Sequence, residues 1–302
     1  MANPVASKRP ASAPASSESS LVASSCSVKN RREYMEDRHC IVKDIVPGMH
    51  LIGVYDGHGG CKVSDLCAEF LPEMLVNRLY ETMHEPTERV RTDPDQSDFR
   101  PNLALKLAIK DIDGIAKRRG IDDACGTTFC AFLVQPSVDL SKREGALTVA
   151  NIGDSRLVMK SGDAVYALTK DHNTKHARER TRVFKAGGSI IKDPYGTDRV
   201  MGTLNMTRSL GDRSLRPFVS PHPVVSKYTL RGNERYIIIG TDGLWDVLSN
   251  QDAMLITDRY FEAKRQGGRK PHNVARELVN AAIARGSTDN ITAIWATWSA
   301  ES

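Results

Sequence analysis

The chain has few aromatic residues, no long apolar run and no cysteine pattern of a metal or disulfide framework. Only three Trp and seven Phe occur among its 302 residues, too few for a platform on which nucleic-acid bases stack. No run reaches the roughly 18 apolar residues of a membrane-spanning helix. We therefore expect neither a nucleic-acid partner nor a membrane partner.

The six cysteines exclude several classes of protein by their spacing. No CxxC pair is present, and no group of histidines stands at the spacing of a zinc site. Free, mostly buried thiols are typical of a reducing compartment, so a cytoplasmic or nuclear location is expected. Residues 1–22 are rich in Ser, Ala and Pro and lack the apolar core of a secretion signal, which predicts a disordered tail. An organellar transit peptide stays open as the alternative for this tail.

From residue 23 to residue 302 the chain is predicted to form one domain. No Pro-, Gly- or Ser-rich linker divides this stretch, and it holds no internal repeat. Its hydrophobic fraction of 40% and charged fraction of 26% are those of an ordinary globular protein. The net charge of +5 favours solubility and a mild attraction to anions such as phosphate.

Apolar residues at helical spacing alternate with short β-branched runs bounded by Gly or Asp. The predicted helices are 62–80, with Pro72 as a kink or break, 103–118, 175–186, 252–265 and 273–285. The predicted strands include 51–55, 127–135, 148–152, 236–239 and 291–298, and two short strands around the turn at 161–163. Hairpin-like spacings favour antiparallel pairing, and helices outside the strands predict an α+β layered domain.

Acidic residues stand beside four of the apolar runs, at turns marked by Gly or Asn. Asp56, Asp154 and Asp242 each come just after a run, and Asp289 comes just before one. The pair Glu36-Asp37 precedes the first run. Each Asp alone is more typical of an ordinary turn, and the Glu36-Asp37 pair of a solvated surface. Together, however, they would meet at one edge of a sheet.

Several carboxylates in one place repel each other unless a cation neutralises them, which indicates a divalent metal site. Oxygen ligands without soft ones favour Mg²⁺ or Mn²⁺. Asp56 is placed to bridge two ions, and the Gly57 carbonyl is a further candidate ligand because glycine lets a metal approach the backbone. Two ions about 3.5–4 Å apart would activate a shared water, so hydrolysis of a phosphate ester is the natural reaction.

Two basic residues fit this chemistry. Arg32 lies four residues before Glu36, and its guanidinium would bind phosphate oxygens in a bidentate way. His58 follows the turn at Asp56 and would protonate the leaving alkoxide. The plainer alternatives are a surface arginine in a basic run and an incidental turn histidine.

Seven strings of the sequence resemble one known family, the metal-dependent serine/threonine phosphatases of type 2C. They run in the family's order as RREYMED (31–37), YDGHGG (55–60), GTTF (126–129), ANIGDSR (150–156), MGTLNMTRSLGD (201–212), GTDGLWDV (240–247) and GSTDNIT (286–292). The resemblance implies two central antiparallel β-sheets packed as a sandwich and flanked by α-helices. It also implies a binuclear Mn²⁺ or Mg²⁺ centre, no covalent phosphoenzyme, and a catalytic domain over residues 23–302.

The resemblance assigns each site residue by position. Asp56 is implied as the bridging ligand, Gly57 as a carbonyl ligand, and Asp242 and Asp289 as ligands of one ion. Glu36 is implied as a ligand of the other ion, with Asp37 beside it or acting through water. Arg32 is implied as the phosphate clamp and His58 as the general acid. Asp154, with Asp242, is implied in a third, weaker metal site.

The expected partners are phosphorylated proteins, and a monomer is expected. Two alternatives stay open: a catalytically inactive binding module with this fold, and a hydrolase of small phosphoesters. The sequence departs from the family at Met201 and at Asn205-Met206. Residues 171–186, the variable flap of the family, are unusually basic through Lys175, Arg178, Arg180 and Arg182. We hypothesise that this charge favours substrates with acidic residues near the phosphate.

Overall fold

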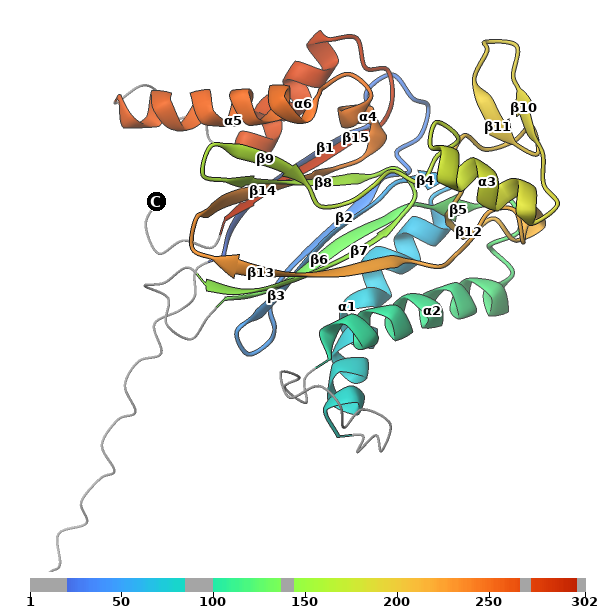
Figure 1. Ribbon diagram of the computed structural model, residues 1–302, viewed down its shortest axis with the longest axis horizontal. Coiled ribbons are helices and arrows are strands. Elements are labelled where there is room, and N and C mark those ends of the chain that lie inside the picture. Colours follow the sequence, from blue (N-terminus) through green and yellow to red (C-terminus); the bar gives the residue numbers. More distant parts are fainter. Residues whose placement is uncertain (1–20, 85–99, 137–143, 267–272, 298–302) are drawn as a thin grey trace, which may run out of the picture.

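The computed structural model describes residues 21–84, 100–136, 144–266 and 273–297. Two five-stranded antiparallel sheets face each other in its centre (Figure 1). The first sheet has the order β1 (Val22–Val28), β15 (Ile291–Thr297), β14 (Glu234–Gly240), β8 (Arg156–Ser161) and β9 (Ala164–Ala167). The second has the order β13 (Val224–Arg231), β7 (Glu144–Ile152), β6 (Phe129–Pro136), β3 (Met49–Tyr55) and β2 (Arg38–Val46).

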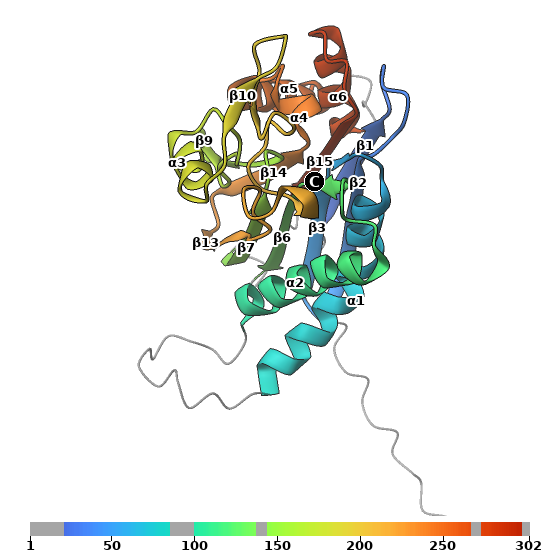
Figure 2. The same ribbon diagram turned by 90° about the vertical axis from the view of Figure 1, so that its right-hand side faces the viewer.

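Helices cover the outer face of each sheet (Figure 2). Helices α1 (Lys62–His84) and α2 (Pro101–Arg119) pack on the second sheet, and α5 (Asn250–Arg265) and α6 (Val274–Ala284) on the first. The layers are therefore helix, sheet, sheet and helix, which confirms the predicted α+β sandwich. Within the described chain, no helix is long and apolar enough to cross a membrane.

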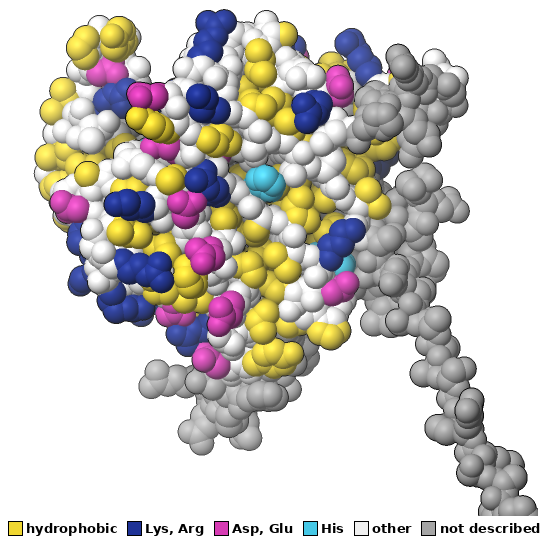
Figure 3. Space-filling model, turned by 180° about the vertical axis from the view of Figure 1, so that it is seen from behind, with side chains coloured by type: hydrophobic (Ala, Val, Ile, Leu, Met, Phe, Trp, Pro, Cys, Tyr) yellow, Lys and Arg dark blue, Asp and Glu magenta, His cyan; other side chains and the backbone are white. Residues whose placement is uncertain are grey.

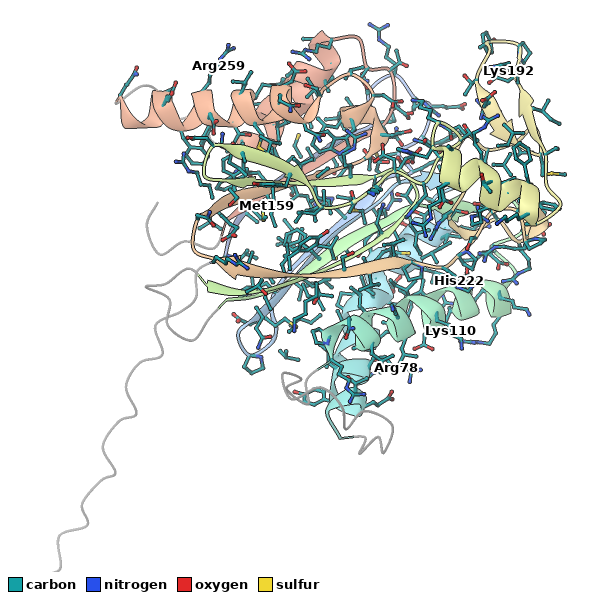
Figure 4. All side chains as sticks on the ribbon, in the orientation of Figure 1. Arg78, Lys110, Met159, Lys192, His222 and Arg259 are labelled. Atoms are coloured by element: carbon teal, nitrogen blue, oxygen red, sulfur yellow. The ribbon has the colours of Figure 1, made fainter. Side chains whose placement is uncertain are left out.

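Strand β3 shows why an uninterrupted apolar run can form a central strand. Leu51 and Tyr55 face α1 and α2, whereas Ile52 and Val54 face the other sheet. Because side chains alternate between the two faces of a strand, burial on both faces requires apolar residues at every position. Met159, labelled in Figure 4, lies in the same inter-sheet core from the opposite sheet.

The predicted helices form, with shifted ends. Pro72 was predicted as a kink or a break; helix α1 continues through it to His84, so a break at this residue is wrong. Helix α3 (Ala177–Lys185) ends close to the predicted glycine stop, where Gly187 has φ +83°. The predicted turn at 161–163 joins β8 and β9.

The predicted tail lies outside the described residues as far as residue 20. Its last two residues are folded, because Leu21 is 1% exposed and Val22 begins β1. Val22 pairs with Thr297 on β15, so the first sheet includes a residue that was predicted to belong to the disordered tail.

Sheet topology explains why acids distant in sequence meet. Strand β6 runs antiparallel to both β3 and β7, so β3 and β7 are parallel and Asp56 and Asp154 follow them at the same end. In the other sheet, Gly240 on β14 pairs with Ala293 on β15. Asp242 after β14 and Asp289 before β15 therefore also share one end of the sandwich.

Candidate metal centre

The backbone of Asp56 is fixed by the threonines of the GTTF string. The Asp56 amide donates to Thr128 Oγ1 at 3.0 Å, and its carbonyl accepts from the Thr128 amide at 2.8 Å and from Thr127 Oγ1 at 3.0 Å. Thr127 belongs to β5 (Gly126–Thr127), which pairs with β4 (Gly57–His58). These bonds hold the turn after β3 in one conformation.

Gly57 stands where only a glycine fits. A Cβ at this position would lie 2.6 Å from the Glu36 carbonyl oxygen and 2.7 Å from Ser64 Oγ. Ser64 Oγ donates to that same Glu36 carbonyl, and Glu36 Oε1 accepts from the Gly60 amide at 2.6 Å. The structure thus brings Glu36 to the turn that carries Asp56.

Asp289 and Asp242 lie on two turns in direct contact. A Cβ at Gly243 would lie 2.0 Å from the Asn290 carbonyl oxygen and 3.3 Å from Asp289 Cβ. Asp242 begins the short helix α4 (Asp242–Trp245), and Thr241 Oγ1 donates to Asp37 Oδ2 at 3.0 Å.

Asn290 is a structural residue of the site that the sequence analysis missed. Its Nδ2 donates to the carbonyls of Lys29 and Tyr34, each at 2.9 Å, and its Oδ1 accepts from the Glu36 amide at 2.7 Å. Asn290 therefore holds the segment with Arg32 and Glu36 against the turn with Asp289. The only sequence signal for it is its place beside an Asp before a strand.

The carboxyl groups at this end interact strongly. Burial raises the pKa of Asp56 and of Asp242 well above the usual range for Asp. The next cause is charge, from Asp242 on Asp56 and from Asp154 on Asp242. Burial likewise raises the pKa of Asp37 to about 6 and that of Asp154 to about 7. Asp56 and Asp242 therefore each lie within electrostatic reach of Asp37, Asp154 and Asp289.

Two of these acids keep an oxygen without a partner. Asp37 and Asp154 are 3% and 4% exposed, and their Oδ1 atoms accept no hydrogen bond from the described residues. A buried carboxylate oxygen without a donor is costly, and a divalent cation would remove both that cost and the mutual repulsion.

The donor set fits Mg²⁺ or Mn²⁺, which bind carboxylate, carbonyl and water oxygens. Among the described residues, no three His, Cys, Asp or Glu side chains already enclose a point as ligands of one ion. The fit thus depends on charge and on the unpaired oxygens, and an ion of this kind completes its coordination with water.

Arg32, the predicted phosphate clamp, contacts a predicted metal ligand. Its Nη2 donates to Asp289 Oδ2 at 2.6 Å, and the arginine side chain is 55% exposed. His58, the predicted general acid, lies on β4, and its Nε2 is 2.7 Å from Asp212 Oδ2. Each of these two basic side chains thus contacts a carboxylate, Asp289 or Asp212, that the sequence analysis did not foresee as its partner.

Two of the basic side chains of the flap are paired with carboxylates of the same region. Helix α3 and the hairpin of β10 (Ile190–Lys192) and β11 (Asp198–Val200) protrude beside the sandwich (Figure 1), and Lys192 is labelled on the hairpin in Figure 4. Arg180 pairs with Asp198, and Arg182 pairs with Glu179.

Two of the four basic residues named for the flap remain outward. Lys175 is 79% exposed, and its Nζ is 4.0 Å from Asp246 Oδ1. Arg178 is exposed and makes no side-chain hydrogen bond or ion pair with the part of the chain that the structure describes. Of the four basic residues, only Lys175 and Arg178 therefore remain candidates for contacting acidic residues of a substrate.

Comparison with known proteins identifies the same family over nearly the whole chain. A family model described as Protein phosphatase 2C matches residues 22–291. "Probable protein phosphatase 2C 76" of Arabidopsis thaliana is 33% identical over 92% of this chain, and "Protein phosphatase 2C homolog 1" of Schizosaccharomyces pombe is 32% identical over 96%. The chain spans 59% of the length of the first of these relatives and 76% of the second.

A solved structure supports the fold. "Crystal structure of serine-threonine phosphatase 2C from Toxoplasma gondii" aligns with a TM-score of 0.73 at 23% identity, over 91% of this chain and 94% of that one. The alignment therefore agrees with the sandwich and its flanking helices.

Proposed function

The chain belongs to the protein phosphatase 2C family, and from this membership we propose that it hydrolyses phosphoserine and phosphothreonine in proteins with the help of two Mn²⁺ or Mg²⁺ ions. The observation that carries the proposal is the group of mutually interacting Asp carboxylates at one end of the sandwich, two of them with a buried, unpaired oxygen. The expected partners are phosphoproteins, and we propose that the chain acts as a monomer.

Each predicted ligand keeps its role in the proposal. Asp56, Gly57, Asp242, Asp289 and Glu36 would hold the two ions, Asp37 would act through water, and Asp154 would serve a third ion. When bound, the ions would supply a nucleophilic water at neutral pH and a positive field around the phosphoryl group.

The two basic residues complete the reaction. Arg32 would hold the phosphate oxygens, exchanging its bond to Asp289 for bonds to the substrate. His58 would give a proton to the serine or threonine oxygen as that oxygen leaves phosphorus. These two steps orient the ester and remove the need for a free alkoxide.

The state of the nearby thiols supports direct attack by water. A hydrogen bond to Asp65 raises the pKa of the Cys61 thiol, and burial raises that of Cys125. Both cysteines flank the loop after His58, since Cys125 Sγ donates to the Gly60 carbonyl at 3.1 Å. Thiols that stay protonated are poor nucleophiles, so we propose no phosphocysteine intermediate.

The charge distribution on one face of the molecule supports the proposal that the chain has no nucleic-acid partner. Figure 3 shows basic and acidic side chains interspersed on the face seen from behind. No broad basic surface, of the kind that binds a phosphate backbone, is present on that face. The cytoplasmic or nuclear location stays a prediction.

Removal of metal and of single ligands tests the proposal. With Mn²⁺, the chain should dephosphorylate a phosphothreonine peptide, and a chelator should abolish turnover. Asp56→Ala and Asp242→Ala should each lower kcat by more than about 100-fold without loss of the thermal unfolding transition. Asp163→Ala, at the exposed turn between β8 and β9, is the matched control and should keep full activity.

The same assay separates the alternatives. A binding module without catalysis would show no turnover in Mn²⁺, and its ligand variants would not differ from the parent chain. A hydrolase of small phosphoesters would prefer a nucleotide monophosphate to the phosphopeptide. Either result would replace the proposed function.

A further inference from the structure

Two strings of the sequence, GTTF and MGTLNMTRSLGD, have no chemical role in the scheme above beyond the threonines that fix Asp56. In the structure they meet at His58. Strand β12 (Leu210–Gly211) pairs with β5, and β5 pairs with β4, so His58 lies opposite Gly126 and Gly126 opposite Gly211. Asp212 directly follows β12, so this pairing brings it beside His58, although the two residues are 154 positions apart in the sequence.

The contact between the two side chains is short and enclosed. His58 Nε2 lies 2.7 Å from Asp212 Oδ2, and Asp212 is 3% exposed. Ser209 Oγ donates to the same Oδ2. The other ring nitrogen, His58 Nδ1, is buried without a hydrogen-bond partner among the described residues.

Gly126 leaves the space that this contact needs. A Cβ at Gly126 would lie 2.2 Å from Asp212 Oδ2 and 2.6 Å from His58 Nε2. Any side chain here would separate the two groups. The glycine of GTTF is therefore required by the close approach of His58 and Asp212, a reason that turn formation alone does not supply.

Asp212 is held in an unfavourable backbone conformation by several bonds. Its φ is +49°, which is uncommon for a residue with a Cβ. Its amide donates to the Cys125 carbonyl at 3.2 Å. The amide of the next residue, Arg213, donates to the Asp122 carbonyl at 2.8 Å, and the Arg213 side chain pairs with the Asp122 carboxylate. These bonds fix where the Asp212 carboxylate lies.

We propose that Asp212 is the positioning residue of His58, an inference that rests on the proposed function. The ring donates its Nε2 hydrogen to Asp212, which fixes the orientation of the ring and leaves Nδ1 as the nitrogen that has no hydrogen-bond partner among the described residues. Nδ1 then gives its proton to the leaving oxygen as the P–O bond breaks and its electron pair passes to that oxygen. The ring is left neutral, with its Nε2 hydrogen still bonded to Asp212.

The plainer reading is that this contact only ties β4 to β12. The two readings differ in their dependence on the leaving group. A proton from His58 matters for a poor leaving group such as a threonine alkoxide, and much less for p-nitrophenolate, which leaves without one. A structural contact would affect both substrates alike.

The test compares kcat and KM for a phosphothreonine peptide and for p-nitrophenyl phosphate, both in Mn²⁺. Asp212→Asn should lower kcat for the peptide by roughly 10–100-fold, with less than about a threefold loss for the aryl ester and with KM unchanged for both. Ser209→Ala, which removes one donor to Asp212, should shift the ratio in the same direction by a smaller factor. In a His58→Ala background, Asp212→Asn should have no further effect on the ratio.

Asp113→Asn is the matched structural control. Asp113 Oδ1 accepts from the Gly211 amide and from Arg216, each at 3.1 Å, so it braces the same loop without touching His58. This variant should lower kcat for both substrates by the same factor. Equal losses for the two substrates in Asp212→Asn as well would overturn the positioning role.

A measurement on the unaltered chain guards against a variant that does not fold. By ¹⁵N NMR, Nε2 of the neutral His58 ring should carry the hydrogen and Nδ1 should be bare; the opposite tautomer would refute the proposal. A failure of the proposed function itself has a different signature. It would appear as inactivity of the parent chain in Mn²⁺, or as equal losses for both substrates in His58→Ala.

Discussion

At the residue scale, Arg32 is shared between two partners. It donates to Asp289 at 2.6 Å in the structure, and in the proposed reaction it binds the substrate phosphate. A half-exposed arginine can exchange one anion for another at small cost, because water screens both pairs. In the proposed reaction, the pair with Asp289 would therefore keep the guanidinium at the site before substrate arrives.

Arg32→Ala should raise KM for a phosphopeptide by roughly 10–100-fold, the value of a charge-assisted hydrogen bond or two. Arg32→Lys should recover only part of the loss, since an ammonium group cannot bind two oxygens in a fork. The control is Arg31→Ala, because Arg31 is exposed and makes no side-chain bond within the described ranges. Similar KM values for the Arg31 and Arg32 variants would contradict the clamp.

The sequence singles out candidate site residues by features that are local in the chain. Asp56, Asp154 and Asp242 stand out because each follows an apolar run at a glycine turn. Asp212 and Asn290 do not, because their roles arise only when distant segments pair, β12 with β5 and the 29–36 segment with the turn before β15. The spacing of residues along the sequence does not indicate which distant segments will be in contact.

At the element scale, the flap is organised around one buried anion. Glu179 on α3 accepts from Arg208 Nη2 at 2.6 Å, from Thr207 Oγ1 at 3.0 Å and from Arg182 Nε at 3.1 Å. Burial opposes its charge, but the hydrogen bonds from Arg208 and Arg182 outweigh burial and lower the pKa of Glu179 to about 2. The sequence analysis predicted helix α3 but assigned Arg180 and Arg182 to substrate recognition, whereas the structure pairs them with Asp198 and Glu179.

Glu179→Ala should destabilise the chain by about 3 kcal/mol, because it removes a buried anion and leaves the two partly buried guanidinium groups of Arg182 and Arg208 without it. Urea unfolding measures this loss. Glu81→Ala is the control, since Glu81 is 55% exposed in its pair with Arg78 and should change stability by less than about 0.5 kcal/mol. Equal effects of the two variants would remove Glu179 from the centre of the flap.

The flap should also be the part most sensitive to acid. Because the pKa of Glu179 is depressed, its contribution is present above pH 4.5 and is lost as pH falls toward about 2. Burial lowers the pKa of His172 to about 4, so its contribution is lost between pH 6.5 and 4. Hydrogen exchange in residues 177–200, corrected for intrinsic rate, should therefore lose protection before the strands do as pH falls; the reverse order would contradict this.

The hypothesis of an acidic substrate concerns the two outward flap cations, Lys175 and Arg178. Lys175→Ala with Arg178→Ala should raise KM for a phosphopeptide with neighbouring acidic residues and leave KM for a neutral phosphopeptide unchanged. Arg259→Ala, an exposed substitution on α5 far from the flap (Figure 4), is the control. Equal changes for both peptides would reject the preference for acidic substrates.

At the scale of the whole molecule, the proposed metal centre predicts that metal binding and folding are coupled. The fold class followed from the sequence because strands and helices have distinct apolar periods. The path of the chain between the two sheets did not follow from periodicity, since it depends on which strands pair. That path places five aspartates at one end of the sandwich: Asp37, Asp56, Asp154, Asp242 and Asp289. Their mutual repulsion destabilises the folded chain, and a bound cation would remove this repulsion.

This cost predicts how metal stabilises the chain at different pH. The pKa of Asp37 is raised to about 6 and that of Asp154 to about 7, so their favourable contribution is lost as pH rises through these values in the absence of metal. Saturating Mn²⁺ should therefore raise Tm by roughly 5 °C or more at pH 7.5, and by less at pH 5.5, where protons compete with the metal. Glu179 and His172 titrate in the same way with and without Mn²⁺, so their effects cancel when the Tm without metal is subtracted from the Tm with metal. A shift in Tm that does not depend on pH, or that survives Asp242→Ala, would contradict the coupling.

The central claim is that oxygens of Asp56, Asp242 and Asp289 hold two divalent cations. The most direct measurement is anomalous diffraction at the manganese edge from crystals grown with Mn²⁺. The account predicts two anomalous peaks about 3.5–4 Å apart with Asp56 between them. A map without peaks at these carboxylates, from crystals of protein that turns over substrate, would contradict it.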